Sequence, residues 1–194
     1  MDRQQPTVAL FAKYPRAGQA KTRLIPALGP EGAAALHRRL VEQTLEIIRQ
    51  SGFPFIVWTT GASHDEFAEW LGEDVPLAEQ GEGDLGDRLS RVPAPAILLG
   101  ADIPDLSATH LKQAAETLED APVAIGPAAD GGYYLLTFRN AVPFLFDDMP
   151  WGGDGVLGET IRRLEARDMA FTLLETLRDC DRPEDLAHWP DLAP

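Results

Sequence analysis

The sequence predicts an α/β sandwich built on a mostly parallel sheet. Up to Ile125, short apolar runs of strand length alternate with segments of helical periodicity. This alternation is typical of strand–helix–strand crossovers, which give parallel strands with helices packed on the sheet. Polar motifs follow the first, third and fourth apolar runs, at the strand ends where open α/β sheets bind ligands.

The expected strands are apolar runs bounded by turn residues, which is the pattern of buried strands. They cover residues 7–12, 53–59, 75–78, 96–99, 123–125, 133–138 and 171–174. The strands at 123–125 and 133–138 lie close together in the sequence, which indicates that one later strand runs antiparallel.

The expected helices are marked by caps and by apolar spacing. They cover residues 30–51, 63–71, 87–91, 107–118, 154–166 and a terminal turn at 183–188. Pro30 suits a first helical position, and Ser63 with Glu66 forms a capping box. Ser107 and Asp154 are expected to act as N-caps.

Length and composition restrict the class of protein. The 194 residues contain no repeat or linker, which predicts a single domain over 1–194 with a loose end at 1–5. The net charge of −14 argues against a binder of nucleic acid polymers or of anionic membranes. Cys180 is the single cysteine of the sequence, which excludes an internal disulfide, and the first residues lead us to expect no signal peptide. We therefore expect a cytoplasmic protein.

Four cations follow the first strand within a short loop. Lys13, Arg16, Lys21 and Arg23 stand there in a chain with only 17 Lys and Arg against 31 acids. Loops at strand carboxyl ends gather cations and backbone N–H groups around phosphates. The loop is interpreted as a phosphate site; a solvated basic loop is the alternative.

Two aspartates are candidate metal ligands. Asp102 follows the strand at 96–99, and Asp181 follows the last strand. Two carboxylates, nucleotide phosphate and water form a typical magnesium arrangement. The structural alternatives are that Asp102 caps a turn and that Asp181 begins a helix.

Glycine-rich loops offer further binding positions. Gln80 and Gly86 bound a loop with three glycines, where a side-chain amide could read a base edge. Asp130, with Gly131 and Gly132, forms either a hairpin turn or part of an acceptor site. Trp151 and Asp154 then precede a helix, and Trp151 either stacks on a ligand or anchors the loop.

Taken in order, these motifs resemble the GT-A fold of nucleotide-diphospho-sugar transferases. Lys21-Thr22-Arg23-Leu24 is similar to the element with which sugar-1-phosphate nucleotidylyltransferases hold a triphosphate. The spacing of all motifs, from about residue 7 to 188, resembles a bacterial glycosyltransferase-like family similar to 2-phospho-L-lactate guanylyltransferase. The resemblance implies a three-layer, Rossmann-like sandwich with a mixed, mostly parallel sheet.

The resemblance also implies site residues. Nucleotide-binding positions are Phe11, Ala12, Lys13, Arg16, Gly18, Lys21, Arg23, Gln80 and Gly86. Catalytic positions are Lys21, Arg23 and Asp102; metal ligands for Mg²⁺ or Mn²⁺ are Asp102 and Asp181. Acceptor-binding positions are Asp130, Gly131, Gly132, Trp151 and Asp154.

The implied activity is metal-dependent nucleotidyl or glycosyl transfer from a nucleotide to a small acceptor. Both reactions use the same metal site, and the sequence leaves the choice open. Gly153 and Gly155 depart from the family pattern, which usually has a hydroxyl residue and a larger residue there. A non-catalytic nucleotide-binding or regulatory protein on the same scaffold is therefore the alternative.

Overall fold

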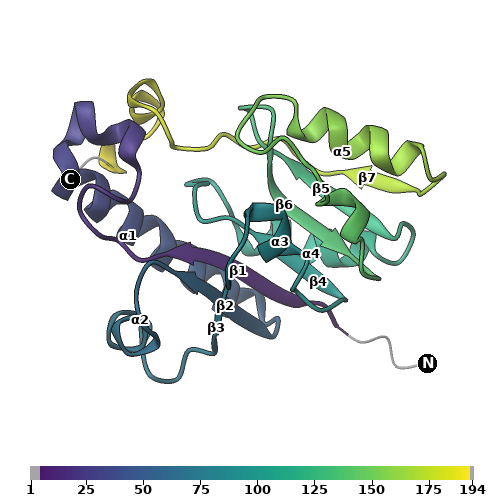
Figure 1. The fold of residues 1–194 in the computed structure, drawn as a ribbon, viewed down its shortest axis with the longest axis horizontal. Helices are drawn as coiled ribbons and strands as arrows, with labels where there is room; N and C mark the ends of the chain where they lie inside the picture. Colours follow the sequence, from purple (N-terminus) through teal and green to yellow (C-terminus); the bar gives the residue numbers. More distant parts are fainter. Residues whose placement is uncertain (1–4, 193–194) are drawn as a thin grey trace.

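The computed structural model describes residues 5–192. Residues 1–4 of the expected loose end at 1–5 therefore lie outside the described residues. Seven strands form one sheet (Figure 1). They are β1 (Thr7–Lys13), β2 (Phe55–Thr60), β3 (Leu77–Glu79), β4 (Ala96–Leu99), β5 (Val123–Pro127), β6 (Tyr133–Phe138) and β7 (Phe171–Leu173). Their order is β3-β2-β1-β4-β6-β5-β7.

The sheet is mixed. β6 pairs antiparallel with both β4 and β5, and every other pair of neighbours is parallel. The expectation that one late strand runs antiparallel is confirmed. A short loop can join β5 to β6 because antiparallel neighbours need no crossover helix.

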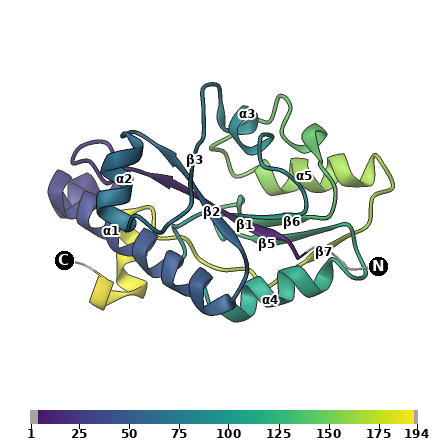
Figure 2. The ribbon, with the colours of Figure 1, turned by 90° about the horizontal axis from the view of Figure 1, so that it is seen from below.

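Helices cover both faces of the sheet, which confirms the three-layer α/β sandwich (Figure 2). The α-helices are α1 (Ile25–Ser51), α2 (His64–Leu71), α3 (Leu85–Leu89), α4 (Ala108–Thr117) and α5 (Val156–Glu165). Short 3₁₀ helices are η1 (Thr22–Leu24), η2 (Pro143–Leu145), η3 (Pro183–His188) and η4 (Pro190–Leu192). α1, α2 and α4 pack on one face, and α3, α5 and η2 pack on the other. No helix in the described range is long and apolar enough to cross a bilayer.

The residues of β1 show why helices must cover both faces of the sheet. Val8 and Leu10 belong to the apolar core under α1, α2 and α4, whereas Ala9 and Phe11 belong to the core on the opposite face. Successive side chains of a strand point to opposite faces, so a strand that is apolar throughout must be buried on both.

The start of α1 is interrupted. Gly29 has non-helical backbone angles (φ 71°, ψ 167°) inside the helix, directly before Pro30. The expected start at Pro30 is therefore the start of the long uninterrupted part, and a short turn precedes it. Leu36 and Leu40 of this part pack with Cys180 and Leu192, which fixes the C-terminal segment beside α1 (Figure 1).

Several expected boundaries are corrected. Asp154 is not the N-cap of α5, because the helix begins at Val156 and Gly155 occupies the cap position. α3 begins earlier than expected, because Asp84 caps it with Asp87 as the reciprocal partner. The capping box that begins at Ser63 is confirmed.

Candidate functional site

Lys21 joins three segments that are distant in the sequence. Its Nζ lies 2.6 Å from Asp102 Oδ1 and 3.6 Å from Asp181 Oδ1, and it donates to the Cys180 carbonyl at 2.6 Å. The Lys21 side chain is 3% exposed. Its backbone is left-handed (φ 47°), which turns the chain into η1. The ammonium of Lys21 therefore lies between the two candidate metal ligands.

Both members of the closest pair are charged. Burial by itself would lower the pKa of Lys21, but the Asp102 carboxylate, and to a lesser extent Asp181, raise it above its usual value. Burial would likewise raise the pKa of Asp102, but the Lys21 ammonium outweighs it and holds that pKa below its usual range. Lys21 and Asp102 therefore form an ion pair.

The backbone holds the two aspartates in place. The amide of Cys180 donates to the Asp102 carbonyl at 2.8 Å, which fastens the C-terminal segment to the end of β4. Asp185 accepts from the amides of Asp181 and Arg182, so the turn that carries Asp181 is closed by a carboxylate cap. Asp102 and Asp181, paired by sequence reasoning, are brought together by these bonds.

The donor set fits a metal that is shared with a ligand. Within residues 5–192, no group of three or more His, Cys, Asp or Glu side chains is placed to hold a metal. Mg²⁺ commonly takes one or two carboxylates together with substrate phosphates and water. The carboxylates of Asp102 and Asp181 match that requirement, and a cation already lies between them.

The other three cations of the basic loop have different partners, and they do not all lie at the two carboxylates. Arg23 donates to Asp181 at 2.6 Å and stays at the site. Arg16 pairs with Glu66 of α2 at 2.9 Å, and no ion pair joins it to Asp102 or Asp181 among the described residues. Lys13 donates to the Gln19 carbonyl at 2.8 Å and closes the loop. The structure therefore brings Lys21 and Arg23 to the carboxylates but not Arg16.

Gln80 is buried, and its amide faces the protein. The Nε2 atom donates to the Trp58 carbonyl at 2.9 Å and approaches the carbonyl of Ala12, which is itself buried, at 3.4 Å. This amide nitrogen ties β1 and β2 together, so in this arrangement both of its hydrogen bonds go to backbone carbonyls of the fold.

Gly86 is explained by packing. A Cβ at this position would lie 2.5 Å from the Phe146 carbonyl oxygen. Gly18, by contrast, has open space around it and a positive φ of 76°, so it serves the turn of the basic loop.

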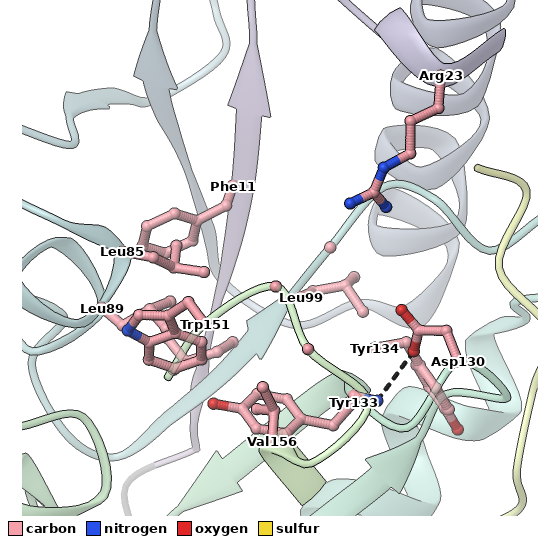
Figure 3. Close-up of a pocket in the computed structure, with 15 residues that line it drawn as sticks. Phe11, Arg23, Leu85, Leu89, Leu99, Asp130, Tyr133, Tyr134, Trp151 and Val156 are labelled. Atoms are coloured by element: carbon pink, nitrogen blue, oxygen red, sulfur yellow. Dashed lines mark hydrogen bonds between the residues drawn. The ribbon is translucent and has the colours of Figure 1, made fainter. Parts of the chain in front are cut away.

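An apolar cavity of about 240 Å³ opens beside the ion pair (Figure 3). Its lining residues are Phe11, Arg23, Leu85, Leu89, Leu98, Leu99, Gly100, Asp130, Gly132, Tyr133, Tyr134, Trp151, Gly152, Gly153 and Val156. Figure 3 shows Phe11, Leu85 and Trp151 gathered on one side of the view, with Arg23 and Asp130 on the other. We call this space the apolar cavity.

A second cavity of about 180 Å³ contains the candidate metal ligands, and we call it the acidic cavity. Its lining residues are Gly100, Asp102, Ile103, Ala128, Asp130, Gly132, Tyr133, Tyr134, Asp179 and Asp181. It shares Asp130 and Tyr133, among others, with the apolar cavity, so the two are contiguous. Sequence reasoning missed Asp179, although it stands two residues before Asp181.

The acceptor positions predicted from sequence divide into two groups. Asp130, Gly132 and Trp151 line the apolar cavity, whereas Gly131 and Asp154 line neither cavity. Asp130 Oδ1 accepts from the Gly132 amide at 2.9 Å. Gly131 has a φ of 92°, and a Cβ there would collide with the Asp154 carbonyl. Gly131 and Asp154 therefore join the two loops at the backbone.

Comparison with known proteins shows which solved structures share this fold. The chain is 30% identical to a Desulfovibrio desulfuricans protein provisionally assigned as a nucleotide-diphospho-sugar transferase. The TM-score is 0.87, and the match covers 93% of this chain and 84% of that one. A Mycobacterium tuberculosis protein solved in complex with manganese shares the fold, with a TM-score of 0.53 and 21% identity over 95% of this chain and 97% of that one.

A curated relative carries a named activity. The 2-phospho-L-lactate guanylyltransferase of Methanoregula boonei is 27% identical over 127 residues. The match covers 66% of this chain and spans 56% of the length of that enzyme.

A family model supplies the broadest assignment. It matches residues 43–153, more than half of the chain. The description of the family is "uncharacterized protein conserved in bacteria". The matched range includes Asp102 and much of the lining of both cavities. The chain therefore belongs to the DUF2064 family, on a nucleotide-diphospho-sugar transferase fold.

Proposed function

We propose that the protein is a metal-dependent nucleotidyltransferase that moves a nucleotidyl group from a nucleoside triphosphate to a small anionic acceptor. The observation that carries the proposal is the convergence of Lys21, Asp102 and Asp181 at the edge of two contiguous cavities. The similarity to a guanylyltransferase supports the nucleotidyl reaction over other transfers.

The roles follow from charge. Asp102 and Asp181 would hold Mg²⁺ or Mn²⁺, which when bound neutralises the triphosphate and stabilises charge on the transferred phosphorus. Lys21 and Arg23 are the cations next to these carboxylates, and we assign them to the phosphate oxygens. Asp130, Gly132 and Trp151 line the cavity in which we place the acceptor.

The reaction needs no protein nucleophile. An acceptor phosphate oxygen attacks the α-phosphorus in line, the bond to the bridging oxygen breaks, and pyrophosphate leaves with the electron pair. The attacking phosphate is already ionised at neutral pH, so no general base is required. Cys180 is an unsuitable nucleophile, since burial raises the pKa of its thiol to about 11.

Calorimetry with GTP, CTP, UTP and ATP, each with and without Mg²⁺, tests the binding step. We expect at least one nucleotide to bind with Mg²⁺ and to lose affinity about tenfold or more in Asp102→Asn. Asp120→Asn, at an exposed position after α4, is the matched control and keeps full affinity. Equal binding by Asp102→Asn and wild type would refute the proposed ligand role.

Glycosyl transfer from a nucleotide sugar is the second candidate. The assignment of the Desulfovibrio protein favours it, and Asp130 lines the cavity as a candidate general base. Mass spectrometry of the released product separates the two reactions. Pyrophosphate from a triphosphate supports nucleotidyl transfer, and a nucleoside diphosphate from a nucleotide sugar supports glycosyl transfer. Nucleotide binding without product from any acceptor would support the non-catalytic alternative.

A further inference from the structure

We infer that the acceptor has an apolar body attached to one anionic group, and that the apolar cavity binds that body. The inference rests on the proposed function and adds the chemical class of the second substrate. Its basis is the chemistry of the cavity wall and the continuity of this cavity with the candidate metal ligands.

The wall away from the ion pair is hydrocarbon and aromatic. Phe11, Leu89 and Val156 contribute apolar surface, and Trp151 packs edge-on against Tyr133 with ring centroids 6.4 Å apart. Packed aromatic rings give a rigid surface that favours an apolar or planar ligand. Binding of an apolar group to such a wall is favourable because the ligand displaces water from apolar surface.

Leu85 marks the rim of the cavity. It is 42% exposed, and only Leu173 is similarly exposed among the large hydrophobic residues that the structure describes. An exposed leucine beside an apolar cavity adds surface that a bound apolar group would cover. Leu173 lies on the edge strand β7 and does not line the cavity.

The charges of the lining limit the ligand to one anionic group. Arg23 is the single cation and Asp130 the single anion among the lining residues. Arg23 already pairs with Asp181, at the side where the acidic cavity begins. Because the proposed function assigns Arg23 to the triphosphate, the lining offers no cation for a second anionic group on the acceptor. The single anionic end is therefore placed toward the reacting phosphorus, where the metal would lie, and the apolar body away from it.

The wall is poorly suited to a polyhydroxylated sugar. The Tyr133 hydroxyl and the Trp151 Nε1 atom are buried and have no hydrogen-bond partner among the described residues. In this arrangement neither atom is exposed to the cavity, so neither is placed to meet a sugar hydroxyl. Arg23 and Asp130 are the charged partners that the lining offers, so sugar hydroxyls placed against Trp151 and Tyr133 would lose hydrogen bonds to water without regaining them.

The nucleobase is the competing occupant. Base recognition relies on polar groups that meet the base edge, and the lining contains no side-chain amide. The nearest candidate, Gln80, is engaged by backbone carbonyls inside the fold. We therefore assign the cavity to the acceptor, and with it Phe11, which the family resemblance places at the nucleotide.

Binding of two probes by calorimetry tests the inference. Phenyl phosphate carries an apolar body and glucose 1-phosphate a polar one. We expect phenyl phosphate to bind about tenfold tighter than glucose 1-phosphate or inorganic phosphate. Equal or tighter binding of glucose 1-phosphate, or no binding of phenyl phosphate, would overturn the inference.

Leu85→Ser and Leu173→Ser form a matched pair at exposed positions. We expect Leu85→Ser to weaken phenyl phosphate binding about fivefold, and Leu173→Ser to leave it unchanged. Nucleotide affinity with Mg²⁺ is measured on the same variants. Loss of nucleotide affinity in Leu85→Ser, with phenyl phosphate unaffected, would assign the cavity to the base. Absence of nucleotide binding in the wild type would instead refute the proposed function, which separates the two failures.

Discussion

Replacing Lys21 with methionine removes the cation from between Asp102 and Asp181. Methionine has about the same length as lysine but no charge. The variant therefore loses the ammonium that lies 2.6 Å from Asp102 Oδ1 and 3.6 Å from Asp181 Oδ1 in the wild type. We expect the variant to be less stable than wild type in the presence of a chelator. We also expect Mn²⁺ to stabilise the variant more than the wild type, since in the wild type the ammonium must first leave.

The magnitude follows from burial. Removing one member of a buried ion pair costs about 3–5 kcal/mol. Lys21 is 3% exposed, but Asp102 is 49% exposed and is partly screened by water. The lower end, about 3 kcal/mol, therefore applies, and it corresponds to a fall in Tm of about 6–12 °C for a chain of this size. Mn²⁺ at about 100 times its Kd would restore about 2.7 kcal/mol.

Urea denaturation of wild type and variant, each in chelator and in Mn²⁺, measures both effects. Lys112→Met, on the exposed side of α4, is the control for loss of a positive charge. Two results would refute the reasoning. The first is a Lys21→Met variant as stable as wild type in chelator. The second is equal stabilisation of the two proteins by Mn²⁺, which would mean that the metal and the ammonium do not compete for one position.

Three further predictions follow from local geometry. Gly131→Ala should lose about 2 kcal/mol or more of unfolding free energy because its φ is 92°, whereas Gly158→Ala in α5 should gain about 0.5–1 kcal/mol; similar effects in denaturation would contradict this. Arg23→Ala should weaken Mg²⁺–nucleotide binding about tenfold, and Arg16→Ala should change it less than about threefold; the reverse order in calorimetry would exclude the assignment of Arg23. With a pKa raised to about 11, Cys180 stays protonated at pH 8, so its reaction with a thiol reagent should be slow in the native state and fast in urea; equal rates would argue against burial of the thiol.

The sequence by itself determined the layers of the fold. The buried first strand and the capping box at Ser63 depend on neighbours within a few residues, and the structure confirms both. The antiparallel β6 was predicted for the same reason, since the short β5–β6 connection limits how the chain can continue. The order of the motifs also identified the nucleotide-diphospho-sugar transferase fold.

The tertiary structure alone decided how the site residues are paired. Lys21 bonds to the Cys180 carbonyl 159 residues away, and no local pattern predicts such a contact. The same is true of Gln80, whose amide is engaged by a neighbouring strand, and of Gly86, which is required by the Phe146 carbonyl. A sequence motif fixes which chemical group is present, but the partner of that group depends on segments that meet only when the sheet is assembled.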